Sequence, residues 1–283
     1  MRYRALGKSG IKVSEIGLGC EHLEGRPEKD VYAVVERARH YGVNIFDVFM
    51  SEPNVRTYLG GAFAGYRKEI TIQGHIGALW QNGQYARGRD LDACKRHFED
   101  LLTRLRTDYI DVGMIHFIDS VTEWDEVVSS PVMEYARRLK AEGVIRTIGL
   151  SSHVPVTALR AVESGAIDVL MFSLNPAFDV LPESTELEQL REPESYKDGG
   201  ITGQDQTRRA LYAACEAAGV GVTVMKALAS GLLLNAKSSP FGLALTAEQC
   251  VHYALSRPAV ASVLPGCRTP AEVDQVMRYE TAD

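Results

Sequence analysis

The sequence lacks any apolar run of the roughly 18–20 residues that a membrane-spanning helix needs, and its opening residues, MRYR, carry no apolar signal core. It also lacks a basic cluster, since 37 Asp and Glu outnumber 31 Lys and Arg and the net charge is −6. These absences argue against a nucleic-acid partner and a membrane partner. A cytoplasmic location is therefore the default prediction.

Cysteine is scarce and scattered along the chain. The number of cysteines is odd, and no CxxC or Cys/His pair stands at a metal-binding spacing. This pattern predicts free thiols in a reducing compartment and no cysteine-based metal site. The cysteines are Cys20, Cys94, Cys215, Cys250 and Cys267.

What the sequence does contain is a regular alternation of short apolar runs and helical patterns. Eight runs are each followed by a helical segment, which is the count of a (β/α)8 TIM barrel. Before them, residues 3–13 predict an N-terminal β-hairpin around the turn Lys8-Ser9-Gly10. We expect a single barrel domain over residues 1–283. The eight predicted strands are Ile16–Cys20, Val43–Asp47, Ile70–Gln73, Ile110–Ile115, Ile145–Ser151, Val169–Ser173, Val220–Met225 and Ala261–Leu264.

The junctions between the units support the repeated βα pattern. A glycine stands between a helix end and a strand at Gly42, Gly143, Gly165 and Gly219. Glycine just past a helix adopts the left-handed conformation without a Cβ clash. Capping boxes are predicted at Thr246–Gln249 and Thr269–Glu272, and Asp90 is predicted to cap the third helix. That helix carries an apolar stripe of Leu91, Cys94, Phe98, Leu101, Leu102 and Leu105.

Two connections are longer than a barrel needs, residues 79–89 and 177–206. Structureless loops beyond roughly 12–15 residues are usually functional or disordered. Both follow strands and so belong to the end where barrels bind substrates. We interpret the first as a wall of the substrate pocket and the second as a mobile lid or a disordered segment. If these loops fold over the mouth of the barrel, four aromatic side chains would line the pocket; the alternative is that they pack onto the barrel. They are Trp80, Tyr85, Trp124 and Phe178.

Three titratable side chains end consecutive predicted strands: Asp47, His75 and His116. Adjacent parallel strands lie about 4.7–4.9 Å apart, so these groups are expected to meet. A histidine can exchange a proton at neutral pH, and a neighbouring carboxylate fixes its charge and orientation. The same set could instead bind a metal, although no second strand-end carboxylate supports that alternative, and each histidine alone could be purely structural.

Two cations near the carboxyl ends of the last strands are candidate ligand contacts. Lys226 is open to three interpretations: a phosphate contact, a Schiff-base nucleophile, or a side chain that reaches solvent. Arg268 immediately precedes a capped helix, where free N–H groups and the helix dipole favour an anion. The alternative there is an ordinary capped surface helix with a solvated arginine.

Taken together, these residues resemble the aldo-keto reductase family over essentially the whole chain. The set of matches is specific, although no single segment is. The matching segments are Arg4–Gly19, Gly42–Asp47, Arg104–Asp111, His116, Gly143–Ser151, Asn175-Pro176 and Ser262–Arg268.

The resemblance implies a barrel that binds NADP(H) and transfers hydride between nicotinamide and a carbonyl or alcohol. The family's catalytic set is Asp, Tyr, Lys and His, of which Asp47 and His116 match. His75 stands at the lysine position, and residues 48–52, which follow Asp47, contain no tyrosine. The closest resemblance is to a divergent branch that reads Gln-Gly-His at residues 73–75. Many members of that branch carry a ferredoxin-like tail, which this sequence does not show before it ends at Asp283.

The resemblance also implies the cofactor contacts. Arg268 and Glu272 match the clamp for the adenosine 2′-phosphate, which favours NADP(H) over NAD(H). Met171 and Met225 replace a glutamine and a nicotinamide-stacking aromatic, so the nucleotide end is better matched than the nicotinamide end. The implied positions are Gly19, Cys20, Asp47, Ser151, Ser152, Met171, Met225, Lys226, Leu228, Gly231, Leu232, Gly266, Arg268 and Glu272.

Three functional hypotheses follow. The first is an NADP(H)-dependent oxidoreductase for a carbonyl or alcohol substrate, with Asp47, His75 and His116 as its acid–base set and no metal. The second is a lyase, isomerase or dehydratase in which the two histidines move protons and Lys226 is the Schiff-base candidate. The third is a non-catalytic nucleotide-binding protein, suggested by the missing tyrosine and lysine.

Overall fold

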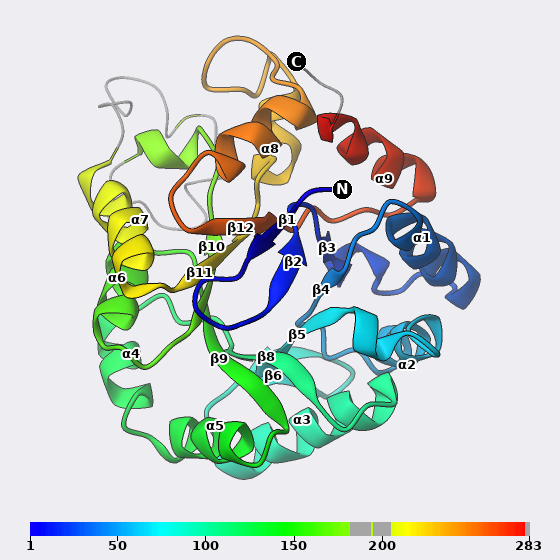
Figure 1. The fold of residues 1–283 in the computed structure, drawn as a ribbon, viewed down its shortest axis with the longest axis vertical. Helices are drawn as coiled ribbons and strands as arrows, with labels where there is room; N and C mark the ends of the chain where they lie inside the picture. The colour runs from blue at the N-terminus through cyan, green and yellow to red at the C-terminus, as the bar shows by residue number, and fades with distance from the viewer. Residues whose placement is uncertain (182–193, 195–204, 281–283) are drawn as a thin grey trace.

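The fold of this computed structural model, which describes residues 1–181, 194 and 205–280, is a barrel ringed by helices (Figure 1). Eight parallel strands form one sheet, and bridges Ile16↔Val263 and Gly19↔Gly266 join its two edges. The predicted (β/α)8 fold is confirmed. In sheet order the strands are β12 (Val260–Val263), β11 (Gly221–Met225), β10 (Val169–Ser173), β9 (Ile145–Ser152), β8 (Ile110–Ile115), β5 (Thr71–Ile76), β4 (Ile45–Val48) and β3 (Leu18–Gly19).

Most helix ends form as their sequences predict. Asp90 caps its helix, Thr246 forms the full capping box, and the four junction glycines all have positive φ. At Thr269 only half of the predicted box forms, because the Glu272 carboxylate accepts from the backbone N–H of Arg268. The helices are α1 (Glu28–His40), α2 (Pro53–Ala62), α3 (Leu91–Leu105), α4 (Val121–Val127), α5 (Pro131–Ala141), α6 (Pro155–Glu163), α7 (Gln206–Ala218), α8 (Ala247–Leu255) and α9 (Pro270–Met277).

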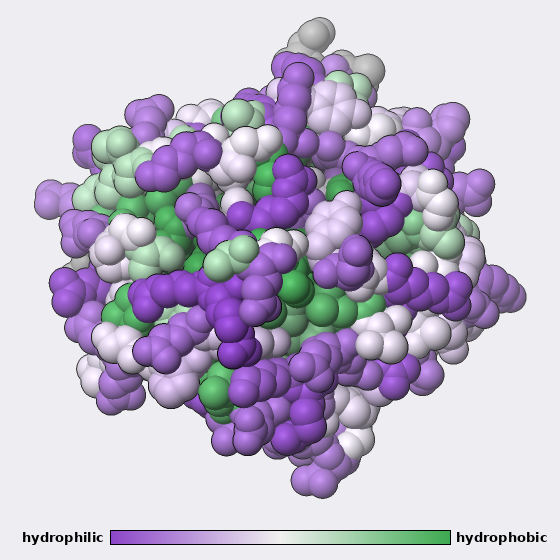
Figure 2. Space-filling model, turned by 60° about the horizontal axis from the view of Figure 1, so that its bottom comes forward, coloured by the Kyte–Doolittle hydropathy of each residue, from purple (hydrophilic) through white to green (hydrophobic). Residues whose placement is uncertain are grey.

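Side chains alternate between the two faces of each strand and so divide the core in two. On β4, Phe46 and Val48 pack outward against the helices, whereas Ile45 faces the barrel interior. The inner cluster runs up to Met171, which also lines the pocket described below. On the face shown in Figure 2, polar side chains cover most of the surface, with apolar ones visible between them. Within the described residues, no helix combines the length and apolarity that crossing a membrane requires.

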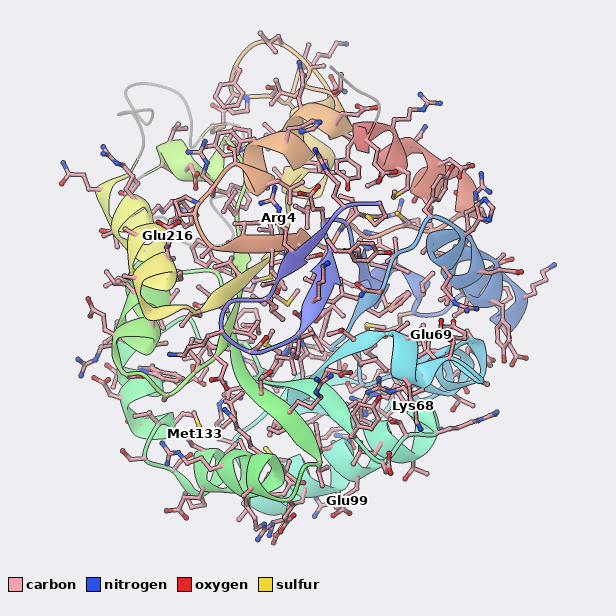
Figure 3. The ribbon with its side chains drawn as sticks, in the orientation of Figure 1. Arg4, Lys68, Glu69, Glu99, Met133 and Glu216 are labelled. Atoms are coloured by element: carbon pink, nitrogen blue, oxygen red, sulfur yellow. The ribbon has the colours of Figure 1, made fainter. Side chains whose placement is uncertain are left out.

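The predicted N-terminal hairpin, β1 (Tyr3–Ala5) and β2 (Lys12–Ser14), is confirmed and covers the end where the barrel strands begin. Leu6, Ile11 and Val13 complete the inner cluster from below. Arg4 lies over this end, whereas Glu99 and Glu216 lie on the rim (Figure 3). The Arg4 guanidinium donates to Glu15, to the carbonyl of Leu255 at the end of α8 and to the carbonyl of Val260 at the start of β12. The hairpin thus closes one end of the barrel and leaves the other for ligands.

Residues 79–89, which we interpret as a wall of the substrate pocket, form strands rather than an irregular loop. They belong to an antiparallel hairpin of β6 (Ala78–Gln81) and β7 (Gln84–Arg87). Asn82 and Gly83 both have positive φ, as a two-residue type I′ turn requires. The strand pairing places Trp80 directly opposite Tyr85.

The other long connection, residues 177–206, lies mostly outside the described residues, so the lid prediction is not addressed there. Its described beginning forms η3 (Phe178–Val180). Phe178 packs in a cluster with residues of η6 (Ala229–Leu234) beside β11. This cluster anchors the start of the connection to the barrel.

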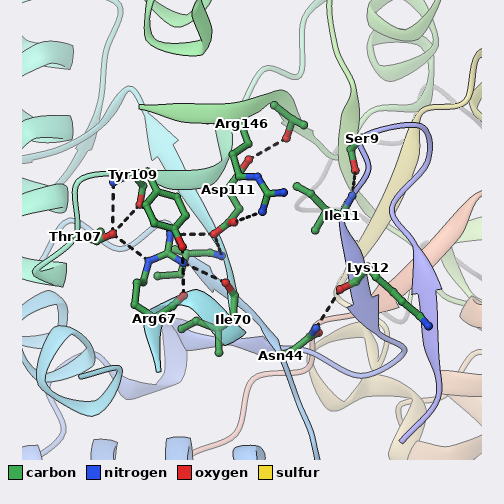
Figure 4. A network of polar contacts seen from close by, with 12 residues as sticks. Ser9, Ile11, Lys12, Asn44, Arg67, Ile70, Thr107, Tyr109, Asp111 and Arg146 are labelled. Atoms are coloured by element: carbon green, nitrogen blue, oxygen red, sulfur yellow. Dashed lines mark hydrogen bonds and ion pairs between the residues drawn. The ribbon is translucent and has the colours of Figure 1, made fainter. Parts of the chain in front are cut away.

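A buried carboxylate, Asp111, fastens the beginnings of three neighbouring strands (Figure 4). It accepts from the backbone N–H of Ile72 at 2.9 Å, from the Arg67 guanidinium at 2.9 Å and from the Arg146 guanidinium at 3.0 Å. Asp111 itself is only 1% exposed. Because its partners come from separate elements, the carboxylate fixes the strand register from which the opposite end of the barrel is built.

We therefore expect Asp111→Ala to lower the free energy of unfolding by about 3–5 kcal/mol, since two guanidinium groups and an N–H lose a buried partner. Urea unfolding followed by circular dichroism measures the change. Asp125→Ala, which breaks an exposed pair with Arg160, is the matched control and should alter stability little. Equal losses in the two variants would contradict the role of Asp111.

Candidate active site

At the open end of the barrel, Asp47, His75 and His116 form one hydrogen-bonded row, as the strand-end pattern predicted. His75 Nε2 lies 2.9 Å from Asp47 Oδ1, and the two Nδ1 atoms of His75 and His116 are 2.8 Å apart. The row continues to Tyr85, whose hydroxyl lies 2.6 Å from His116 Nε2. Four titratable side chains are thus linked end to end.

Strand geometry explains why these side chains converge. Ile45, two residues before Asp47, faces the barrel interior, so the alternation of the strand turns Asp47 inward as well. His75 lies within β5 rather than after it, because the strand extends three residues beyond its predicted end. His116 directly follows β8, and Phe117 then takes the left-handed conformation with φ 48°. The Phe117 N–H donates to Ser151 Oγ, which holds this turn.

The carboxylate at one end sets the direction of every proton in the row. An ionised Asp47 can only accept, so His75 Nε2 carries a hydrogen. With both rings neutral, His75 Nδ1 then accepts from His116 Nδ1–H, and His116 Nε2 accepts from the hydroxyl of Tyr85. The amide of Gln73, 3.0 Å away, gives Asp47 Oδ1 a second donor. The arrangement leaves no ring nitrogen of either histidine without a partner.

Burial keeps this row free of bulk water. Asp47, His75 and His116 are 2%, 2% and 4% exposed, whereas Tyr85 is 41% exposed. Burial, with nearby His75, Arg89, His153 and Arg87, holds the pKa of His116 well below its usual value. The Phe49 ring stacks on His116 with 5.6 Å between centroids. His116 is therefore a neutral imidazole at neutral pH.

The row opens into a pocket of about 810 Å³ that extends to the beginning of α9. This volume is within the range of small-molecule sites. Most positions implied as cofactor contacts line it, so both predicted ends of the site share one cavity. The lining positions are Gly19, Asp47, Ser151, Met171, Met225, Lys226, Leu228, Gly231, Gly266, Arg268 and Glu272.

Three implied contacts lie behind the pocket wall instead. Cys20 is fully buried under η1 (Cys20–Leu23), Ser152 donates to Asp119, and Leu232 packs in the cluster around Phe178. These side chains support the wall rather than face the cavity. Of the four aromatic side chains considered for the pocket, Tyr85 lines it and the other three do not. Trp124 and Phe178 are instead fully buried in the protein.

The far end of the pocket has the features of an anion site. Arg268 is exposed and lines the cavity, and Thr269 caps α9 directly beyond it. The Glu272 carboxylate accepts from the backbone N–H of Arg268 at 2.7 Å, and both residues line the pocket. A dinucleotide with a phosphate at this end therefore fits the residues present.

Metal binding is not favoured by this geometry. In the part of the chain that the structure describes, no group of three or more His, Cys, Asp or Glu side chains is arranged to hold a metal ion. Both ring nitrogens of His75 are already engaged, by Asp47 and His116. The five cysteines are free and buried, and burial raises the pKa of Cys267 to about 12.

Sequence reasoning named Tyr85 as pocket lining but missed its contact with His116. The signal was present, because Asn82-Gly83 is a strong hairpin turn and places Tyr85 on a strand instead of a loose loop. Sequence reasoning also missed the pair of His153 and Asp119. His153 lines the pocket, and its Nδ1 lies 3.0 Å from Asp119 Oδ2. No spacing in the sequence links these two residues.

Comparison with known proteins agrees with this architecture. A model of the aldo/keto reductase family matches residues 15–244. An uncharacterized oxidoreductase, YqkF of Bacillus subtilis (strain 168), is 30% identical over 94% of this chain and 87% of its own length. L-galactose dehydrogenase of Arabidopsis thaliana is 25% identical over 96% of this chain and 86% of its own length. The holo form of aldo-keto reductase AKR11C1 from Bacillus halodurans covers 100% of this chain and 92% of its own, with a TM-score of 0.76 at 23% identity, which shows a shared fold.

The neutral, buried His116 predicts a specific loss of stability in acid. In the unfolded chain His116 becomes protonated near pH 6.5, whereas in the folded chain it stays neutral at that pH. The free energy of unfolding therefore falls as pH drops below that value. In His116→Gln this fall should be smaller by up to about 1.4 kcal/mol per pH unit. Urea unfolding at two pH values measures the difference. His40→Gln, at an exposed position, should leave the pH dependence as in the wild type, and an identical dependence in His116→Gln would contradict the assignment.

Proposed function

Because the chain belongs to the aldo/keto reductase family, we propose that this oxidoreductase uses NADP(H) to interconvert a small carbonyl compound and its alcohol. One observation carries the proposal. A single cavity joins the row of Asp47, His75 and His116 to the anion site at Arg268. Proton-exchanging groups and a nucleotide anchor are thus placed at opposite ends of the same pocket.

NADP(H), when bound, supplies or accepts the hydride. The protein must provide the proton that balances charge on the substrate oxygen. His75 and His116 can store and move that proton, while Asp47 orients His75 and stabilises any positive charge on it. His75 takes the place of the lysine that the family resemblance leads one to expect, and residues 48–52 contain no tyrosine. The motif Gln73-Gly74-His75 supports a place in the divergent branch whose members often carry a ferredoxin-like tail.

The nucleotide is proposed to lie with its adenosine phosphate at α9. Arg268 offers a bidentate donor for a 2′-phosphate, and the positive end of the α9 dipole favours an anion there. Met225 and Met171, on inward positions of β11 and β10, line the opposite part of the pocket. NAD(H) is the alternative, and its affinity does not depend on Arg268.

Two further proposals concern the whole chain. The closed barrel supports treating residues 1–283 as one domain. The five free, buried cysteines support a cytoplasmic location, where thiols stay reduced. Both proposals are consistent with a small-molecule substrate.

The double variant His75→Gln/His116→Gln tests the acid–base assignment. We expect carbonyl-dependent oxidation of NADPH to fall at least about 100-fold, because general acid–base groups contribute that much or more. The Kd for NADPH should change little, since neither side chain lies at the anion end of the pocket. His40→Gln is the control for an unrelated histidine. Turnover that survives in the double variant would contradict the assignment.

Other outcomes separate the alternative functions. NADPH binding without turnover on a broad carbonyl and alcohol panel would indicate a non-catalytic nucleotide-binding protein. Borohydride trapping of a carbonyl compound on Lys226, without any change in NADPH absorbance, would indicate a lyase or isomerase.

Arg268→Gln tests the choice of nucleotide. Loss of a charged, bidentate phosphate contact should raise the Kd for NADPH by about 10–100-fold and leave the Kd for NADH nearly unchanged. Fluorescence titration with both nucleotides measures the effect. Arg160→Gln, on the exposed face of α6, is the matched control. Equal weakening of both nucleotides would show that Arg268 does not recognise the 2′-phosphate.

A further inference from the structure

Resting on the proposed oxidoreductase function, we propose that Tyr85 is the catalytic residue that exchanges the proton with the substrate oxygen. The two histidines cannot do so directly. Both nitrogens of His75 are engaged by Asp47 and His116, and both nitrogens of His116 are engaged by His75 and Tyr85. The hydroxyl of Tyr85 is therefore the atom of the row through which a proton can pass to a ligand in the pocket.

The exposed fractions of the four side chains agree with Tyr85 as the group next to the substrate. Asp47, His75 and His116 are each at most 4% exposed, whereas Tyr85 is 41% exposed and lines the cavity. His75 and His116 line the same cavity, but the phenol is by far the most exposed of the three side chains. The buried histidines then act behind Tyr85 as its proton source and acceptor.

The hairpin that carries Tyr85 is fastened to the rest of the site. The Ser51 hydroxyl donates to the carbonyl of Leu79 at 2.5 Å, which fixes β6. Beyond β7, the Arg89 guanidinium donates to the carbonyl of His116 at 2.7 Å and to Glu123 at 2.8 Å. Tyr85 also packs edge-on against Phe49, with ring centroids 6.1 Å apart. The phenol is thus held in place by contacts on both strands.

Reduction of a carbonyl balances if the row begins with one extra proton. In that state both nitrogens of His75 carry hydrogen beside Asp47, His116 Nε2–H donates to the Tyr85 oxygen, and Tyr85 O–H donates to the substrate. The carbonyl carbon accepts the hydride that NADPH supplies, the π electrons move to oxygen, and that oxygen takes the Tyr85 proton.

The proton that Tyr85 gives to the substrate is replaced by a proton from the buried histidines. Tyr85 takes the proton from His116 Nε2, and His116 Nδ1 takes the proton from His75 Nδ1. The row then has the neutral arrangement deduced from the structure, with Tyr85 donating to His116. One proton taken up from water through the exposed side of Tyr85 returns the row to its protonated state. Oxidation of an alcohol uses the same steps in reverse.

The charge preferences of the groups fit these states. Burial raises the pKa of Tyr85, although Arg87 and Arg89 oppose the shift, so the phenol keeps its proton at neutral pH. Burial also lowers the pKa of His116. The Asp47 carboxylate, 2.9 Å from His75 Nε2, stabilises a positive charge on His75 rather than on His116.

Tyr85→Phe tests the inference, because it keeps the ring contacts and removes only the hydroxyl. In single-turnover reduction of a panel of small aldehydes by NADPH, we expect the rate to fall by about 10²–10⁴-fold. The Kd for NADPH should stay unchanged. Tyr32→Phe is the matched control, since that tyrosine is 38% exposed and lies on α1 outside the pocket.

A second measurement does not depend on turnover. The imidazole nitrogen NMR signals, recorded with and without NADP⁺, should show a shift at His116 Nε2 in Tyr85→Phe and none in Tyr32→Phe. An unshifted signal would overturn the inference by removing the contact on which it depends.

The outcomes distinguish this inference from the proposed function. If Tyr85→Phe reduces aldehydes at the wild-type rate, Tyr85 is not the proton donor, and the oxidoreductase proposal stands. If the wild type fails to oxidise NADPH with any carbonyl compound, the proposed function falls, and the role of Tyr85 falls with it.

Discussion

The hydrogen bond between His75 Nε2 and Asp47 sets the chemistry of the whole site. A carboxylate accepts and does not donate, so its 2.9 Å contact fixes which nitrogen of His75 carries a hydrogen. While both rings are neutral, that choice fixes the tautomer of His116, and the tautomer of His116 fixes the direction of the Tyr85 hydroxyl. A single ionised group thus orders a row of four side chains that come from four different elements.

The barrel supplies this row by simple geometry. Parallel strands turn alternate side chains inward, and neighbouring strands bring their carboxyl ends together. The N-terminal hairpin seals the opposite end with Leu6, Ile11 and Val13, so the row lies above an apolar floor. In that environment an unpaired charge is costly, which is why every nitrogen in the row is engaged and why His116 stays neutral.

The predictable part of the site was the part built from strand ends. Asp47, His75 and His116 each follow or end an apolar run, and strand alternation alone predicts that they meet. Tyr85 was harder, because its contact with His116 depends on a hairpin that leaves the barrel and folds back. Asn82-Gly83 signalled that hairpin, but its angle to the barrel depends on Arg89 and Ser51, which no local pattern reveals. The same limit applies at Glu272, whose carboxylate bonds the N–H one residue before the predicted cap.

The presence of histidine where the family resemblance predicts lysine has a physical consequence. A lysine ammonium has three donors and no acceptor, so beside His116 it would force His116 Nδ1 to accept. His116 Nε2 would then carry a hydrogen permanently, and Tyr85 could donate only outward. An imidazole at His75 can both accept and donate along one line, so the row can load and release a proton without moving a side chain. The histidine therefore allows proton transfer in both directions along the row, which ends at the phenol of Tyr85 on the β6–β7 hairpin, 2.6 Å from His116 Nε2.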